Sequence, residues 1–253
     1  MNVTLIAHTP DPEKVVASAA KLCYSSSDVQ TLMDNLTPEK VDSFVQMLAS
    51  YGHESPVEHV SFTFGIEGVS RSCTHQLVRH RIASYSQKSQ RYVSEKGFEY
   101  ITPPAIAEDP EALSRFEETM AAVSDAYNDL ADLLEAKHTA ALTEAGKTPE
   151  EAAKIARKAA IEDARFVLPN ACETKIIVTM NARTLLNFFH HRCCNRAQWE
   201  IRAVAQEMLR LCREVAPTLF SHAGPSCLNG PCPEGAMTCG RIKEMRERYA
   251  SKK

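Results

Sequence analysis

The chain has 253 residues, a length that suits one large domain or two small ones. Hydrophobic residues make up 44% of it, which is enough to form a core. Its formal net charge at pH 7 is −3, and this acidic balance argues against a general nucleic-acid-binding protein, which is usually basic. The sequence contains no apolar run long enough to span a membrane, and its first residues predict a strand rather than a signal peptide.

Hydrophobic periodicity predicts two strands and two helices in the N-terminal part of the chain. The strands cover residues 2–8 and 60–67, and the second alternates so regularly that we expect one of its faces to be buried. The helices run from residue 12 to about 23 and from 38 to about 51. The second of them has a Thr37 cap followed by proline, a common pair at helix starts.

The rest of the chain alternates long helices with one strand. Apolar residues at helical spacing predict an amphipathic helix from about residue 110 to 146. A capping box with proline at its first helical position predicts the next helix, residues 148–166. A buried strand is expected at residues 175–180. Asn181 then caps a helix on which Arg183, Asn187 and Arg192 could point one way, and the last helix covers residues 199–215.

This order of elements predicts a single α+β domain with a small, mostly antiparallel or mixed sheet and long packed helices. Residues 1–220 would form that domain, since no repeat or linker divides them. Residues 221–253 would be an extension rich in Cys, Gly and Pro, and its charged end, residues 241–253, a solvated helix or a frayed terminus.

Residues 79–92 are the most informative segment, because they hold three arginines, one lysine and one histidine and no acid. Three serines, two tyrosines and two glutamines separate these charges. A helix capped by Ser70 would carry Cys73, Leu77 and His80 on one face, so the segment begins on its last turn and leaves it near Ser84. A solvated basic face or a nucleic-acid patch is the alternative, but the hydroxyls and amides favour a specific anion pocket.

A second polar cluster lies in residues 51–59, where His53, Glu54, Glu58 and His59 are close in sequence. The spacing does not match a zinc-protease helix, and a proline interrupts it, so a loop is expected with His53 and Ser55 as candidate ligand contacts. The glycine-rich fingerprints of dinucleotide and P-loop sites and the nucleophile elbow of hydrolases are absent from the sequence.

The run Arg79-His80-Arg81-x-x-Ser84-x-x-x-x-Ser89-x-Arg91 resembles the signature of the flavin-dependent thymidylate synthases. Four further segments resemble the same family in the same order, at residues 52–59, 164–169, 181–188 and 197–201. Together they extend the resemblance over roughly residues 1–220.

The resemblance implies a cytoplasmic homotetramer with FAD sites built between subunits. It implies reductive methylation of deoxyuridine monophosphate (deoxyuridylate) to thymidylate, with methylenetetrahydrofolate as carbon donor and FAD, reduced by NADPH, as hydride source. The alternatives are a non-catalytic nucleotide- or RNA-binding protein that uses residues 79–91, and a metal-dependent hydrolase built on the His and Cys residues.

The matching motif positions also imply site residues. Flavin contacts are expected at Ser55, Arg79, His80, Arg81, Gln87, Asn181, Ala182, Arg183 and Asn187. Deoxyuridylate contacts are expected at Gln76, Arg79, Gln87, Lys88, Ser89, Gln90, Arg91, Arg165 and Arg192. Arg192 is the expected catalytic residue, because a guanidinium aimed at the uracil would stabilise developing negative charge. Ser89 is expected to bind substrate, since no adjacent base would activate it as a nucleophile.

The nine cysteines are scattered, which is typical of a reducing cytoplasm, and none falls in a motif that would make it a nucleophile. Cys227, Cys232 and Cys239 are candidate zinc ligands, with Cys193, Cys194 or His222 as a fourth. The alternative is a loop-rich extension with reduced thiols.

Overall fold

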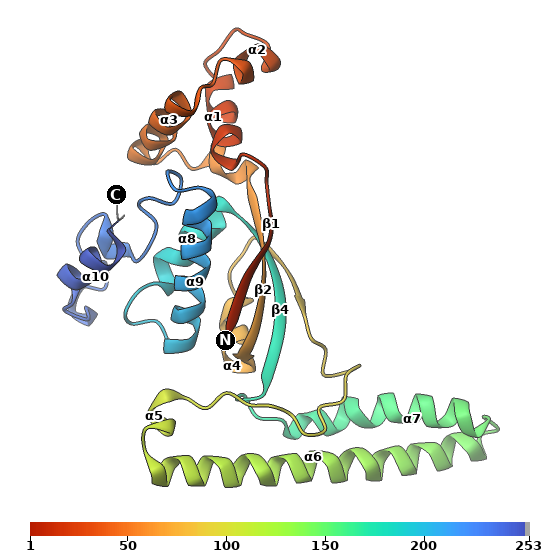
Figure 1. Ribbon diagram of the computed structural model, residues 1–253. Coiled ribbons are helices and arrows are strands. Elements are labelled where there is room, and N and C mark those ends of the chain that lie inside the picture. Colours follow the sequence, from red (N-terminus) through yellow and green to blue (C-terminus); the bar gives the residue numbers. More distant parts are fainter. Residues whose placement is uncertain (251–253) are drawn as a thin grey trace. The chain divides into compact units, whose positions relative to one another are not determined.

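The computed structural model describes residues 1–250 and contains one four-stranded sheet in the order β1-β2-β4-β3 (Figure 1). The strands are β1 (Asn2–His8), β2 (Ser61–Ser70), β3 (Ala83–Gln87) and β4 (Glu173–Asn181). β1 and β2 pair antiparallel, with Asn2 opposite Glu67 and His8 opposite Phe62. Every second residue over the first six of β2 is buried, as its alternation predicts.

The chain forms two compact units. Unit 1 comprises Met1–Glu67, Cys73–Ser86 and the described residues from Ile176 onward, and unit 2 comprises Gly68–Ser72 and Gln87–Lys175. The expected α+β class with a small sheet is confirmed. The extension from residue 221 onward is grouped with unit 1.

Unit 1 holds most of the sheet and, among residues 1–250, seven helices. The helices are α1 (Pro12–Leu22), α2 (Val29–Asp34), α3 (Pro38–Tyr51), the main part of α4 (Arg71–Leu77), α8 (Ala182–Arg192), α9 (Trp199–Val215) and α10 (Ile242–Tyr249), with short 3-10 turns η1 (Ser55–His59), η3 (Ser226–Leu228) and η4 (Gly235–Met237). Phe62 of β2 and Phe189 of α8 both pack edge-on against Phe220, at centroid distances of 5.4 and 6.0 Å. This aromatic core fixes α8 against the sheet, because fully buried rings contribute large apolar areas.

Unit 2 is dominated by a helical hairpin of α6 (Pro110–Glu144) and α7 (Pro149–Ala164), with the short α5 (Pro104–Ala107) and η2 (Arg165–Val167) at its ends. The predicted capping box of α7 is present, with Thr148 and Glu151 bonded reciprocally. Tyr127, Ala131 and Ala164 form a buried cluster within the hairpin. The long helices therefore bury part of their apolar stripe against each other.

The helix that leads into the basic segment ends earlier than its sequence suggested. α4 stops at Leu77, so Arg79–Arg81 lie in a turn, and residues 83–87, expected in a loop from Ser84 on, form β3. The Tyr85 hydroxyl lies within hydrogen-bond distance of the carbonyl oxygens of Leu77 and His80, at 2.9 and 2.8 Å. A side chain thus satisfies carbonyls that a further helical turn would have used.

The C-terminal helix is docked rather than solvated. Met245 and Tyr249 of α10 are buried, and the Tyr249 hydroxyl donates to the Cys193 carbonyl at 3.2 Å. The Arg213 guanidinium holds the Tyr249 carbonyl at 3.1 Å. The charged residues around Met245 and Tyr249 concealed the apolar side of α10 in the sequence. Residues 251–253, part of the expected frayed end, lie outside the described residues.

Candidate functional site

A cavity of about 630 Å³ lies in unit 1 between η1, the turn before β3 and the helix α8. Its walls combine cationic, amide, carboxylate and imidazole groups with a few apolar side chains, and they are formed by Glu54, Glu58, Arg81, Ile82, Asn181, Arg183, Thr184, Leu186, Asn187, His190 and His191. Four of the predicted flavin contacts are among them: Arg81, Asn181, Arg183 and Asn187.

The N-terminus of α8 is fixed at this cavity by local hydrogen bonds. The Asn181 side chain caps the helix by accepting from the Thr184 amide at 2.8 Å. The Thr184 hydroxyl donates to the Ile82 carbonyl at 3.1 Å, which ties the basic turn to α8. Ala182 is fully buried, and its amide donates to the Val60 carbonyl at 2.9 Å, so it positions the helix start between sheet and cavity.

Two carboxylates of the η1 region neutralise Arg183. Its guanidinium forms ion pairs with Glu58 and, at 3.0 Å, with Glu54. The hydrogen bond that Arg183 donates to Glu58 and the charge of Glu54 raise the pKa of Arg183. His53 and Ser55, the expected contacts from this segment, do not line the cavity. His53 borders a neighbouring, more apolar one in unit 1 of about 210 Å³.

A second group of cations lies at the C-terminal end of α8. The Arg192 Nε donates to Nε2 of His80 at 2.9 Å, and the His80 ring packs edge-on against Phe188 at 4.8 Å. Burial, the Arg192 charge and His191 lower the pKa of His80 to about 4, so its imidazole is a neutral acceptor at pH 7. Burial and the nearby charge of Arg79 likewise lower the pKa of Arg192.

These cations lie outside the ion pairs that the described residues form. Among residues 1–250, none of the ion pairs involves Arg79, Arg81 or Arg192. Like charges brought together without an acid favour an anionic ligand. The helical spacing of Arg183, Asn187 and Arg192 suggested that all three point one way. Arg183 and Asn187 line the cavity, and Arg192 does not. It points to His80 instead.

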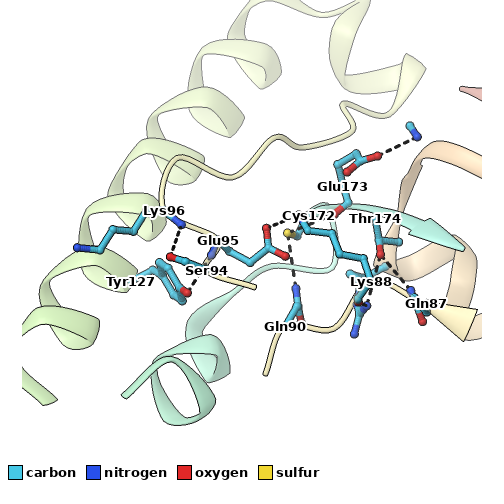
Figure 2. Close-up of polar contacts among 12 residues, drawn as sticks. Gln87, Lys88, Gln90, Ser94, Glu95, Lys96, Tyr127, Cys172, Glu173 and Thr174 are labelled. Carbon is cyan, nitrogen blue, oxygen red and sulfur yellow. Dashed lines mark hydrogen bonds and ion pairs between the residues drawn. The ribbon is translucent and has the colours of Figure 1, made fainter. Parts of the chain in front are cut away.

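The predicted substrate contacts of residues 87–91 belong to unit 2, and each side chain has a partner there. Figure 2 shows the contacts of Gln87, Lys88 and Gln90. The Lys88 ammonium pairs with Glu95 at 2.9 Å. Gln87 donates to the Thr174 hydroxyl at 3.3 Å and Gln90 to the Cys172 sulfur at 3.7 Å. The Ser89 hydroxyl accepts from the Arg91 amide at 3.2 Å, as in a turn.

The remaining predicted contacts are divided between the units. Arg91 pairs with Glu162 at 2.7 Å, and Arg165 donates to the Glu162 carbonyl at 3.0 Å, both in unit 2. Gln76, on α4, belongs to unit 1 together with Arg79 and Arg192.

The candidate zinc ligands Cys227, Cys232 and Cys239 do come together, lining a small enclosed cavity of unit 1 with Cys194. Burial first, and then the other three thiols, raise the pKa of Cys227. In the part of the chain that the structure describes, however, no three His, Cys, Asp or Glu side chains are arranged to hold a metal ion.

The sequence did not predict Glu95 as the partner of Lys88 or Glu162 as the partner of Arg91. It also did not select Glu54 and Glu58, the partners of Arg183, as contacts. Glu54 and Glu58 carry a weak signal, because a spacing of four places both carboxylates on one side of a helical turn. Glu95 is the first acid after the acid-free segment, and Glu162 is distant in sequence from Arg91.

Comparison with known proteins agrees with the motifs. The family described as "Thymidylate synthase complementing protein" matches residues 4–218. The chain is 60% identical to the flavin-dependent thymidylate synthase of Clostridium tetani over 98% of this chain and 97% of the relative. It is 51% identical to that of Geobacter sulfurreducens over 98% of each chain, and 52% identical to that of Nitratidesulfovibrio vulgaris over 94% of each. Within residues 1–250, no helix combines the length and apolar character needed to cross a membrane.

We expect His80 to remain neutral until the pH falls to about 4. An unfolded chain binds a proton at this histidine near pH 6.5, so the folded state loses stability as the pH falls from about 6.5 to about 4. NMR titration of the labelled imidazole measures this directly, and Arg192→Gln should raise the midpoint by removing a nearby charge. A midpoint near 6.5 in the unaltered protein would contradict the proposed geometry.

Proposed function

The chain belongs to the flavin-dependent thymidylate synthase family and methylates deoxyuridylate to thymidylate with a flavin cofactor, and we propose that FAD, NADPH and methylenetetrahydrofolate are the molecules it uses. The main structural support for this proposal is a group of cations, Arg79 and Arg192, beside neutral His80. Neither arginine forms an ion pair among residues 1–250. Deoxyuridylate carries a phosphate, FAD a pyrophosphate and the folate a glutamate tail, so the reaction brings several anions together.

The cavity at the start of α8 fits a flavin nucleotide by the chemistry of its walls. Arg81 and the helix N-terminus suit a pyrophosphate, since backbone N–H groups and the helix dipole favour negative charge there. Asn181 and Asn187 offer amide groups for the polar edges of the ring or the ribose. Glu54 and Glu58 accept from hydroxyl groups, and their pairing with Arg183 limits their repulsion of the phosphates. When bound, the flavin supplies the hydride that completes the new methyl group.

Arg192 is the proposed catalytic residue. His80 accepts its Nε–H and so holds the guanidinium plane, while the terminal nitrogens stay available to a ligand. Negative charge that develops on the uracil ring is stabilised by a fixed cation in a partly desolvated setting. His80 is then a positioning residue, and its lowered pKa keeps it an acceptor across the physiological range.

Residues 87–91 are the proposed deoxyuridylate grip, with Arg91 as the phosphate ligand. A planar guanidinium matches phosphate oxygens two at a time. Arg91 is already paired with the half-buried Glu162, and this partner is exchangeable because ion pairs with access to solvent contribute little net energy. Binding would trade a carboxylate for a phosphate on the same arginine.

We also propose that the protein works as a homotetramer in the cytoplasm. Large apolar side chains stand open on the chain, with Ile82 86%, Phe166 82% and Leu133 68% exposed, as expected where copies meet. A second copy that covers them would also close sites between subunits. The nine cysteines are free thiols, which suits a reducing compartment.

The visible spectrum of the purified protein tests the function. We expect a flavin absorption band that NADPH bleaches without oxygen, and faster bleaching when deoxyuridylate is present. The alternative, a non-catalytic nucleotide- or RNA-binding protein, has no band. Colourless protein that cannot take up added FAD would contradict the proposal.

Arg192→Ala tests the catalytic role. Loss of a positioned charge donor should lower thymidylate formation by about 100- to 1000-fold, while flavin content stays within about twofold. Arg210→Ala is the matched control, since Arg210 lies on the surface of α9 and pairs only locally with Glu207 and Glu214. Turnover that survives in Arg192→Ala would remove Arg192 from the chemistry.

A further inference from the structure

Glu95 is a buried carboxylate without an assigned task, in unit 2 beside the proposed deoxyuridylate grip (Figure 2). Only 4% of its side chain is exposed, and its Oε2 accepts from the Lys88 ammonium at 2.9 Å. Its other oxygen, Oε1, is buried and has no hydrogen-bond partner among the described residues. A buried ion pair of this kind gains little net stability, because the cost of desolvation offsets the attraction.

Both ends of this ion pair are anchored to the scaffold of unit 2. The Glu95 amide donates to the hydroxyl of Tyr127, a fully buried residue of α6, at 3.0 Å. The Lys88 amide donates to the Lys175 carbonyl at 2.9 Å, and its carbonyl accepts from Arg71 at 3.3 Å. The main chain of neither residue can shift without breaking one of these hydrogen bonds.

The segment between the two anchors is the one that carries Ser89, Gln90 and Arg91. The Tyr92 and Val93 amides both donate to the Ser89 carbonyl, at 3.4 and 3.1 Å, so it forms a compact turn. The Lys88–Glu95 pair joins the two ends of this turn, and joining loop ends removes conformations that an open loop would sample. Pre-ordering a binding loop reduces the entropy that binding would otherwise cost.

We propose that Glu95 is a positioning residue that clasps Lys88 and so pre-organises the loop of residues 89–94 for deoxyuridylate. Lys88 acts through this clasp, although its position in the motif predicts a substrate contact. The inference deepens the proposed function and rests on the assignment of residues 87–91 to deoxyuridylate.

Two variants open the clasp from opposite ends, Glu95→Gln and Lys88→Met. Lys96→Met is the matched control, because its ammonium pairs with Asp132 on the surface of the same unit. Hydrogen exchange of residues 89–93 in the ligand-free protein is measured first. We expect exchange to rise about tenfold in both clasp variants and to stay unchanged in the control.

Equilibrium binding of deoxyuridylate to the flavin-loaded enzyme is measured next. We expect Kd to rise about tenfold in each clasp variant, with flavin content within about twofold in both and kcat at saturating substrate within about twofold in Glu95→Gln. The double variant should bind as weakly as either single one, since both changes remove the same contact. If one variant does not fold, Tyr127→Phe loosens the Glu95 anchor while both charges stay in place.

The outcomes separate the clasp from the function it serves. Weaker binding in Lys88→Met alone, with Glu95→Gln like the unaltered protein, would make Lys88 a direct ligand and overturn the inference. Unchanged loop exchange in both variants would overturn it as well. If the unaltered protein does not bind deoxyuridylate, the proposed function of the loop fails, and the exchange measurement still decides whether the clasp orders it.

Discussion

The burial of Arg192 beside a second cation, Arg79, is the constraint from which the proposed site follows. The fold brings these cations together and lowers the pKa of Arg192 by burial and by the charge of its neighbour. Neutral His80 accepts one N–H of Arg192 and brings no charge that would relieve the repulsion. No ion pair among residues 1–250 balances this charge, and an anion that bound there would recover the cost. The turn held by Tyr85 and the aromatic packing of α8 keep the cations in place.

Other cations near these residues in sequence or in space are paired with acids inside the fold. Lys88 and Arg91 each have a carboxylate partner in unit 2, and Arg183 has two in unit 1. The partners differ in burial, from Glu95, which is almost fully buried, to the more exposed Glu162, and this gradient separates structural pairs from exchangeable ones. The cations of a segment that looks uniformly basic in sequence thus differ in the fold. Lys88 and Arg91 have carboxylate partners, whereas Arg79 and Arg81 have none among the described residues.

The sequence was most informative where local patterns decide structure. Alternation predicted β2, and proline and a capping box predicted α7. The family resemblance selected four residues that the fold brings to one cavity. The sequence failed where distant contacts decide. β3 is short and polar. α4 ends early, where the Tyr85 hydroxyl donates to the carbonyls of Leu77, its last residue, and of His80 in the following turn. The α10 contacts and the pairing of Arg91 with Glu162 depend on long-range packing, which no local period encodes.

The most direct measurement is the affinity of the flavin-loaded enzyme for deoxyuridylate and for deoxyuridine, which lacks the phosphate, over a range of salt concentrations. If arginines bind the anion, with Arg91 exchanging Glu162 for the phosphate, deoxyuridylate should bind at least about 100-fold more tightly than deoxyuridine at low salt. That advantage should shrink as salt screens the charges. Equal affinity for the two ligands, or an advantage that salt does not change, would contradict the account.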